Sequence, residues 1–180
     1  NLGLEAWFSE RVQSVVGTSL SAARAYADEQ EGALVEDVLA MAEDLQNFQK
    51  NKFFIEEDEL RNELASLQLD LQRGLKEAFI LNGLGNIELR GERSYLFDFE
   101  KPDELQIKDA GKDVVLINDF NNNELRALIY LNGFGDRYLY VTREVDGTLF
   151  NLLDETQKTA VLYQQMESDR TAYLLNFAVL

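Results

Sequence analysis

Two glycine-rich stretches decide the fold of this chain: residues 81–86 read LNGLGN, and residues 131–136 read LNGFGD. Each lies between segments in which apolar and polar residues alternate, a pattern typical of half-buried strands. Glycine and asparagine between such strands favour tight turns. A phosphate-binding loop would instead open a helix, and strand patterns follow both stretches. The sequence therefore predicts two β-hairpins.

Further elements are predicted outward from these turns. Residues 2–30 carry apolar residues at helical spacing, and the pattern restarts near Gly32, which predicts a bend or a brief break there. Another helix should follow Lys52, and a short one should precede Gly111. The predicted strands are residues 76–81, 86–91, 94–99, 114–118, 124–131 and 137–145.

These elements define an α+β fold, with an antiparallel sheet between helical parts. The 180 residues, 46% of them hydrophobic, suit one domain with a substantial core. We expect a helical part over residues 1–74, the sheet over residues 75–146 and a long C-terminal helix over residues 147–180. That last helix should extend beyond the core and act as an output rod.

Composition excludes several functions. The net charge of -16 opposes binding to nucleic acid, because such binding relies on basic residues that displace counterions. The chain has no Cys and no His, which removes thiol chemistry, a Ser-His-Asp triad and the commonest zinc ligands. Nothing singles out a pair of carboxylates for acid-base work. We predict no catalytic residue and no cofactor.

Two segments suggest metal sites, and an ordinary structural role is favoured for both. Asp119, Asn121 and Asn123 have the spacing that begins a calcium loop, but Glu124 and Tyr130 occupy the positions that require Gly and Glu. An Asn-rich turn explains the segment. Residues 56–59 are all acidic, as is typical of a helix start. We predict no metal site.

The predicted sheet carries the best candidates for a ligand site. Arginine and tyrosine side chains on its strands could present guanidinium and phenol groups to a small anion. An alternative stays open, in which these side chains pair with acids and pack across strands. The candidate residues are Arg126, Tyr130, Tyr138, Tyr140 and Arg143.

Both ends of the chain read as amphipathic helices that still carry large apolar residues at the terminus. The apolar stripes include Trp7, Val15 and Leu20 at one end, and Tyr163 and Leu174 at the other. If the helices continue into apolar runs, transmembrane spans flank this sequence and attach it to a membrane. Stripes longer than a compact core needs also predict a homodimer through the terminal helices.

Three segments carry a family resemblance. Residues 1–12 read NLGLEAWFSERV, residues 19–26 read SLSAARAY, and residues 138–146 read YLYVTREVD, followed by Thr156, Tyr163 and Arg170. This chain resembles the extracytoplasmic sensor region of NtrY-type histidine kinases, membrane sensors of nitrogen-regulation two-component systems. One departure is Gly147, where that family would have proline.

The resemblance implies a domain on the periplasmic side of the inner membrane, held between two transmembrane helices. Kinase modules would follow in the intact protein, so this piece would not itself be catalytic. The resemblance also implies a PAS-like sheet behind a long N-terminal helix, as in Cache sensors. The expected function is signal input to a dimeric kinase. The alternative is a helical protein-interaction module without a small-molecule ligand.

Overall fold

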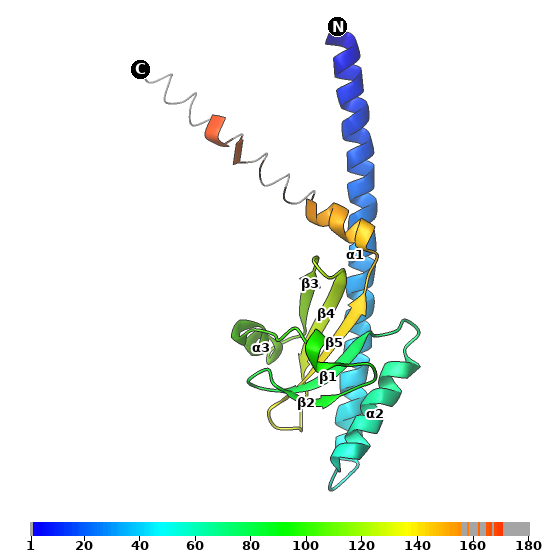
Figure 1. Cartoon of the computed structure of the whole chain (residues 1–180), viewed down its shortest axis with the longest axis vertical. Helices are drawn as coiled ribbons and strands as arrows, with labels where there is room; N and C mark the ends of the chain where they lie inside the picture. The colour runs from blue at the N-terminus through cyan, green and yellow to red at the C-terminus, as the bar shows by residue number, and fades with distance from the viewer. Residues whose placement is uncertain (1, 156–157, 159–161, 163–164, 167, 171–180) are drawn as a thin grey trace. The chain divides into compact units, whose positions relative to one another are not determined.

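The computed structural model describes residues 2–155, 158, 162, 165–166 and 168–170. They fall into two compact units. One combines residues up to Asp28 with residues from Asp146 onward, and the other covers Glu29–Val145. The second unit contains the whole sheet (Figure 1). The architecture is α+β, as predicted.

The first element is a single helix, α1 (Leu2–Lys50), so the predicted break near Gly32 is wrong. At about 1.5 Å per residue this helix is about 74 Å long. Gly32 is exposed, and nothing lies within 4 Å of the place where a Cβ would stand. A glycine costs a helix only about 1 kcal/mol. Burial of Ala27 and Leu34 on either side outweighs that cost.

A second helix, α2 (Glu57–Asp70), starts with Glu57, Asp58 and Glu59 in its first turn. This confirms the acidic run as a helix start, where the helix dipole favours negative charge. The helix buries Leu64 and Gln68.

Five antiparallel strands form one sheet in the order β2-β1-β5-β4-β3. Their bounds are β1 (Glu77–Asn82), β2 (Ile87–Arg90), β3 (Val115–Asp119), β4 (Glu124–Tyr130) and β5 (Arg137–Glu144). Both predicted hairpins are confirmed, as β1–β2 and β4–β5. Because β1 pairs with β5, the two glycine turns lie at the same end of the sheet.

The glycines in these turns have specific roles. Gly85, Gly133 and Gly135 have φ values of 81°, 88° and 75°, in the left-handed region that disfavours other residues. Gly83 has a different role, because its N–H donates to Asp136 Oδ2 at 3.0 Å and joins the two turns. A Cβ on Gly83 would stand 2.2 Å from Asp136 Oδ1.

The connection from β2 to β3 leaves the sheet, so the strand predicted at residues 94–99 is wrong. A short 3-10 helix, η1 (Leu96–Asp98), and the helix α3 (Glu104–Ala110) occur there. Arg93 has a φ of 53°, and this left-handed residue turns the chain away from β2. The helix before Gly111 is confirmed, and Asp103 and Gln106 form a capping box at its start.

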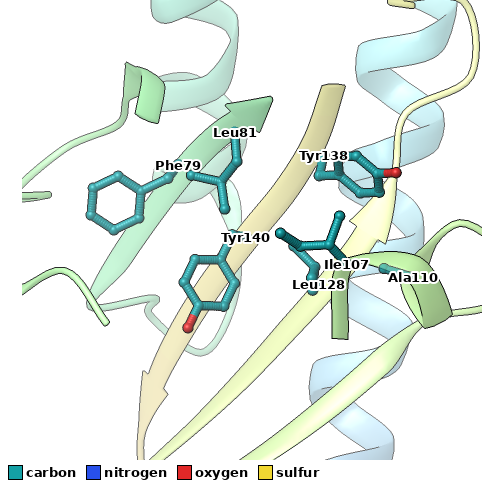
Figure 2. Packing of buried hydrophobic residues seen from close by; sticks show 7 residues of the cluster. All are labelled: Phe79, Leu81, Ile107, Ala110, Leu128, Tyr138 and Tyr140. Carbon is teal, nitrogen blue, oxygen red and sulfur yellow. The ribbon is translucent and has the colours of Figure 1, made fainter. Parts of the chain in front are cut away.

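The sheet has two differently covered faces, because successive strand residues point to opposite sides. We call one the α3 face, since Ile107 and Ala110 of α3 pack there with five sheet residues (Figure 2). These five are Phe79, Leu81, Leu128, Tyr138 and Tyr140. We call the other the α1 face, which includes Ala78, Ile80, Leu139 and Val141. Figure 1 shows α1 and α3 on opposite sides of the sheet.

After β5 the chain turns helical again at residue 147, as predicted. Asp146 Oδ1 accepts a hydrogen bond from Thr148 N at 2.9 Å and so caps this helix. Phe150 and Leu153 are buried. Every described residue from 147 to 170 is helical. The predicted stripe residues Tyr163 and Leu174 lie outside the described residues.

The unbroken α1 gives a stability prediction. Gly32→Ala should raise the free energy of unfolding by about 0.5–1 kcal/mol, because alanine fits the helix and open space surrounds the site. Urea unfolding measures the change. Gly85→Ala is the control and should destabilise, since Gly85 has a φ of 81°. A loss of stability in Gly32→Ala would mean that the helix is interrupted there.

Candidate functional site

Four of the five predicted site residues share the α3 face. Strand β4 contributes Arg126 and Tyr130, and β5 contributes Tyr138 and Tyr140. The register pairs Tyr130 with Tyr138, and Arg126 with Thr142. Arg143 follows Thr142 and therefore lies on the α1 face. The structure thus does not bring Arg126 and Arg143 to one site.

Arg126 is buried, with 3% of its surface exposed, and the chain's own groups surround its guanidinium. Nη1 donates to Thr142 Oγ1 at 3.1 Å, and Nη2 donates to Asp119 Oδ2 at 2.9 Å. Nη2 also lies 3.1 Å from Glu124 Oε2. These contacts match the alternative in which sheet arginines pair with acids across strands. They occupy the guanidinium group that a ligand would need.

Arg143 connects three parts of the second unit. Its Nη2 donates to Asp37 Oδ2 of α1 at 2.6 Å and to the carbonyl oxygen of Arg73 at 2.9 Å. Its Nε donates to the carbonyl oxygen of Gly74 at 3.3 Å. We call the contact with α1 the Asp37–Arg143 latch. Arg143 thus ties the end of β5 both to α1 and to the segment before β1.

The tyrosine hydroxyls hold neighbouring backbone. Tyr130 Oη donates to Gly135 O, and Tyr140 Oη donates to Glu100 O, both at 2.7 Å. The rings of Tyr130 and Tyr138 meet edge to face, with centroids 5.4 Å apart. Burial raises the pKa of Tyr140 to about 12, so this hydroxyl stays protonated and remains a donor. The hydroxyl groups of Tyr130 and Tyr140 therefore stabilise loops of the chain itself.

A largely buried group of charges surrounds Arg126, and no local pattern in the sequence indicates it. We call it the Arg126 cluster: Lys76, Glu77, Asp119, Glu124 and Arg126. Three carboxylates here share two cations. Its members come from the ends of three different strands and the residue before β1, so only the sheet register could reveal it.

The carboxylates of the cluster are held differently. Glu77 Oε2 is buried without a hydrogen-bond partner, and Glu77 Oε1 lies 3.8 Å from Arg126 Nη1. Burial raises the pKa of Glu77, because its charged form loses hydration. Burial also acts to raise the pKa of Asp119, but hydrogen bonds from Asn122 and Arg126 outweigh it and lower that pKa. A hydrogen bond to Glu124 raises the pKa of Lys76.

The segment with calcium-loop spacing forms the turn between β3 and β4. Both carboxylate oxygens of Asp119 accept hydrogen bonds, from Asn122 and Arg126. Asn123 has a φ of 53°, a left-handed conformation that asparagine tolerates. Among the residues that the structure describes, no group of three or more acidic side chains is arranged to hold a metal ion.

The fold and these contacts define a class of protein: an α+β domain in which a sheet is tied to a long N-terminal helix. The chain belongs to the family described as the NtrY N-terminal region, which it matches over residues 1–180. This confirms the resemblance found in the sequence. No solved structure matches the chain.

Longer proteins are similar to this chain. It is 32% identical over 180 residues to the nitrogen regulation protein NtrY of Azorhizobium caulinodans, with 99% of this chain and 23% of that protein covered. It is 29% identical over 183 residues to a putative sensor histidine kinase, NtrY-like, of Rickettsia typhi, with 100% of this chain and 30% of that protein covered. The chain thus spans about a quarter to a third of these relatives. Over the described part of the chain, no helix has the length and hydropathy needed to cross a membrane.

The Arg126 cluster gives a pH prediction. Because folding raises the pKa of Glu77, the fold favours its protonated form, and the charged form lowers stability above the folded pKa. This penalty decreases as the pH falls through the folded pKa toward the unfolded value. Glu77→Gln should therefore raise the melting temperature near neutral pH. In weak acid the difference in melting temperature between the variant and the wild type should be smaller.

Thermal unfolding at a series of pH values measures this effect. Glu88→Gln, at an exposed position of β2, is the matched control and should leave the melting temperature nearly unchanged at each pH. A lower melting temperature for Glu77→Gln at neutral pH would show that the attraction of Arg126 outweighs the desolvation of Glu77.

Proposed function

We propose that this chain is the input domain of a membrane-bound sensor histidine kinase, placed on the periplasmic side of the inner membrane. Membership of the NtrY N-terminal region family supports this, as do the names of its relatives. In this proposal the sheet is a PAS- or Cache-like sensing part, and the terminal helices relay the stimulus. The proposed signalling belongs to nitrogen regulation, in line with the name of the Azorhizobium relative.

The observation that carries the relay is the Asp37–Arg143 latch. Arg143 is 3% exposed, and its guanidinium donates to α1 and to the segment before β1 at once. Charge-assisted hydrogen bonds are about twice as strong as neutral ones, so this latch holds β5 firmly against α1. A shift of β5 would therefore move α1, the helix that leads to the N-terminus.

The output helix provides the functional test. Inserting one residue near Ser168 rotates everything beyond it by about 100°, whereas inserting four residues nearly restores the helical phase. In the intact parent kinase, autophosphorylation should respond strongly to the single insertion and weakly to the fourfold one. Radiolabelled phosphate incorporation in membranes measures both. Equal activity of the two variants would show that this helix is only a tether.

The proposal includes a homodimer through the terminal helices. Membrane spans on both sides would raise the effective concentration of these helices, so the isolated chain should associate only weakly. Sedimentation velocity of the parent protein in detergent, with both spans present, should show a dimer. A strict monomer at all concentrations would contradict it.

A second candidate is a protein-interaction module without a small ligand. It is favoured by Phe53 and Phe54, which follow α1 and lie exposed to solvent. The gene sequence on both sides of this chain discriminates the two candidates. Apolar stretches of about 20 residues on both sides would support the sensor, and polar flanks would support the interaction module.

A further inference from the structure

A pocket of about 540 Å³ opens beside the Arg126 cluster, at the end of the sheet opposite the two glycine turns. Lys76, just before β1, and Glu144, at the end of β5, line one part of it. Arg93, Tyr95 and Asp98, from the connection that follows β2, line another part. We call it the Arg93 pocket. None of the five predicted site residues lines it.

The backbone that carries Arg93 is held from inside the protein. Gln68 of α2 is 4% exposed, and its Nε2 donates to Glu92 O at 3.0 Å while its Oε1 accepts from Glu92 N at 2.9 Å. Ser94 Oγ accepts from Ala78 N of β1 at 2.9 Å. These bonds on both sides keep Arg93 at a φ of 53°, where an arginine rarely lies. The guanidinium is thus presented from a fixed turn.

The charges that line the pocket are largely unused by the fold. Within the described part of the chain, the side chains of Arg93, Asp98 and Glu144 form no hydrogen bond and no ion pair. Lys76 differs, since its Nζ bonds Glu124 at 2.9 Å. The pocket therefore offers one unpaired cation and two unpaired carboxylates. This contrasts with Arg126, whose guanidinium is already occupied.

An aromatic surface completes the pocket. Tyr95 is 50% exposed, and its ring stacks on Phe97, with centroids 5.6 Å apart and an interplanar angle of 15°. Of the two rings, Tyr95 lines the pocket, and an exposed aromatic ring can cover an apolar group of a ligand without a rearrangement of the core. The pocket thus combines both signs of charge with an apolar wall.

We propose that the Arg93 pocket binds a small zwitterion of amino-acid size. Its carboxylate would accept hydrogen bonds from Arg93, its ammonium group would face Asp98 or Glu144, and its apolar part would lie on Tyr95. The two carboxylates would repel a simple anion, and Arg93 and Lys76 would repel a simple cation. Only a molecule that carries both charges matches the whole lining. The binding itself does not depend on the proposed kinase function, although its meaning as a stimulus does.

Isothermal titration calorimetry on this chain tests the site with each standard amino acid as the probe. The strongest binder is then compared with two analogues, one without its amine and one without its carboxylate. For leucine these are 4-methylpentanoate and 3-methylbutylamine. Both should bind at least tenfold more weakly than the amino acid, because each leaves one charge unmatched. The proposal is overturned if no amino acid binds more tightly than about 10 mM, or if either analogue binds as well.

Variants assign the charges to the residues. Arg93→Asn removes the guanidinium while asparagine tolerates the left-handed backbone, so the fold should persist and the amino acid should bind at least tenfold more weakly. The matched control is Arg90→Gln, an exposed arginine of β2 outside the pocket lining, which should bind as wild type does. Asp98→Asn combined with Glu144→Gln should weaken the amino acid but not its deaminated analogue. Unchanged binding in Arg93→Asn would refute the site.

These experiments distinguish a failure of the proposed ligand site from a failure of the proposed signalling function. If an amino acid binds through Arg93 but does not change autophosphorylation of the parent kinase, the ligand site is confirmed and its role as the stimulus site is wrong. If no amino acid binds while the insertions near Ser168 alter autophosphorylation as expected, the relay stands and the ligand site is wrong.

Discussion

The pairing of β1 with β5 is the constraint on which the rest of the sheet depends. Each hairpin closes locally, but a two-stranded hairpin is at best marginally stable on its own. Six residue pairs, from Glu77–Thr142 to Asn82–Arg137, join the hairpins into one sheet. The partners lie far apart in the chain, so this pairing carries a loop-closure cost that burial must offset. Ala78, Ile80, Leu139 and Val141, each at most 1% exposed, provide that burial.

The same pairing creates the Arg126 cluster. It places Glu77 opposite Thr142, which lies opposite Arg126 on the other side. A buried carboxylate without a hydrogen-bond partner is costly, and a guanidinium shared among three acids offsets that cost only in part. Strand pairing, rather than optimal electrostatics, therefore determines the position of Glu77. The raised pKa of Glu77 is the consequence.

Local patterns predicted the parts of this fold that local chemistry determines. Both hairpins, the acidic start of α2 and the helix before Gly111 were predictable, because turn glycines and capping residues act over a few positions. The break at Gly32 and the strand at residues 94–99 were wrong, since tertiary burial and the left-handed Arg93 override local patterns. Alternation alone separates Arg143 from Tyr138 and Tyr140. The partners of Arg126 required the register, which no local pattern contains.

An arginine in a strongly acidic chain has a general difficulty as a ligand-binding group. With a net charge of -16, carboxylates are available to almost any cation, and a buried guanidinium cannot remain unpaired because its desolvation is too costly. Sheet arginines such as Arg126 and Arg143 are therefore used by the fold. A cation remains available to a ligand where water still solvates it and no acidic side chain of the chain pairs with it. Arg93 satisfies both conditions among the described residues, because its side chain lies exposed and unpaired on a turn that Gln68 and Ser94 hold. Fixed turns between strands are thus better places to look for ligand-binding cations in acidic domains than the strands themselves.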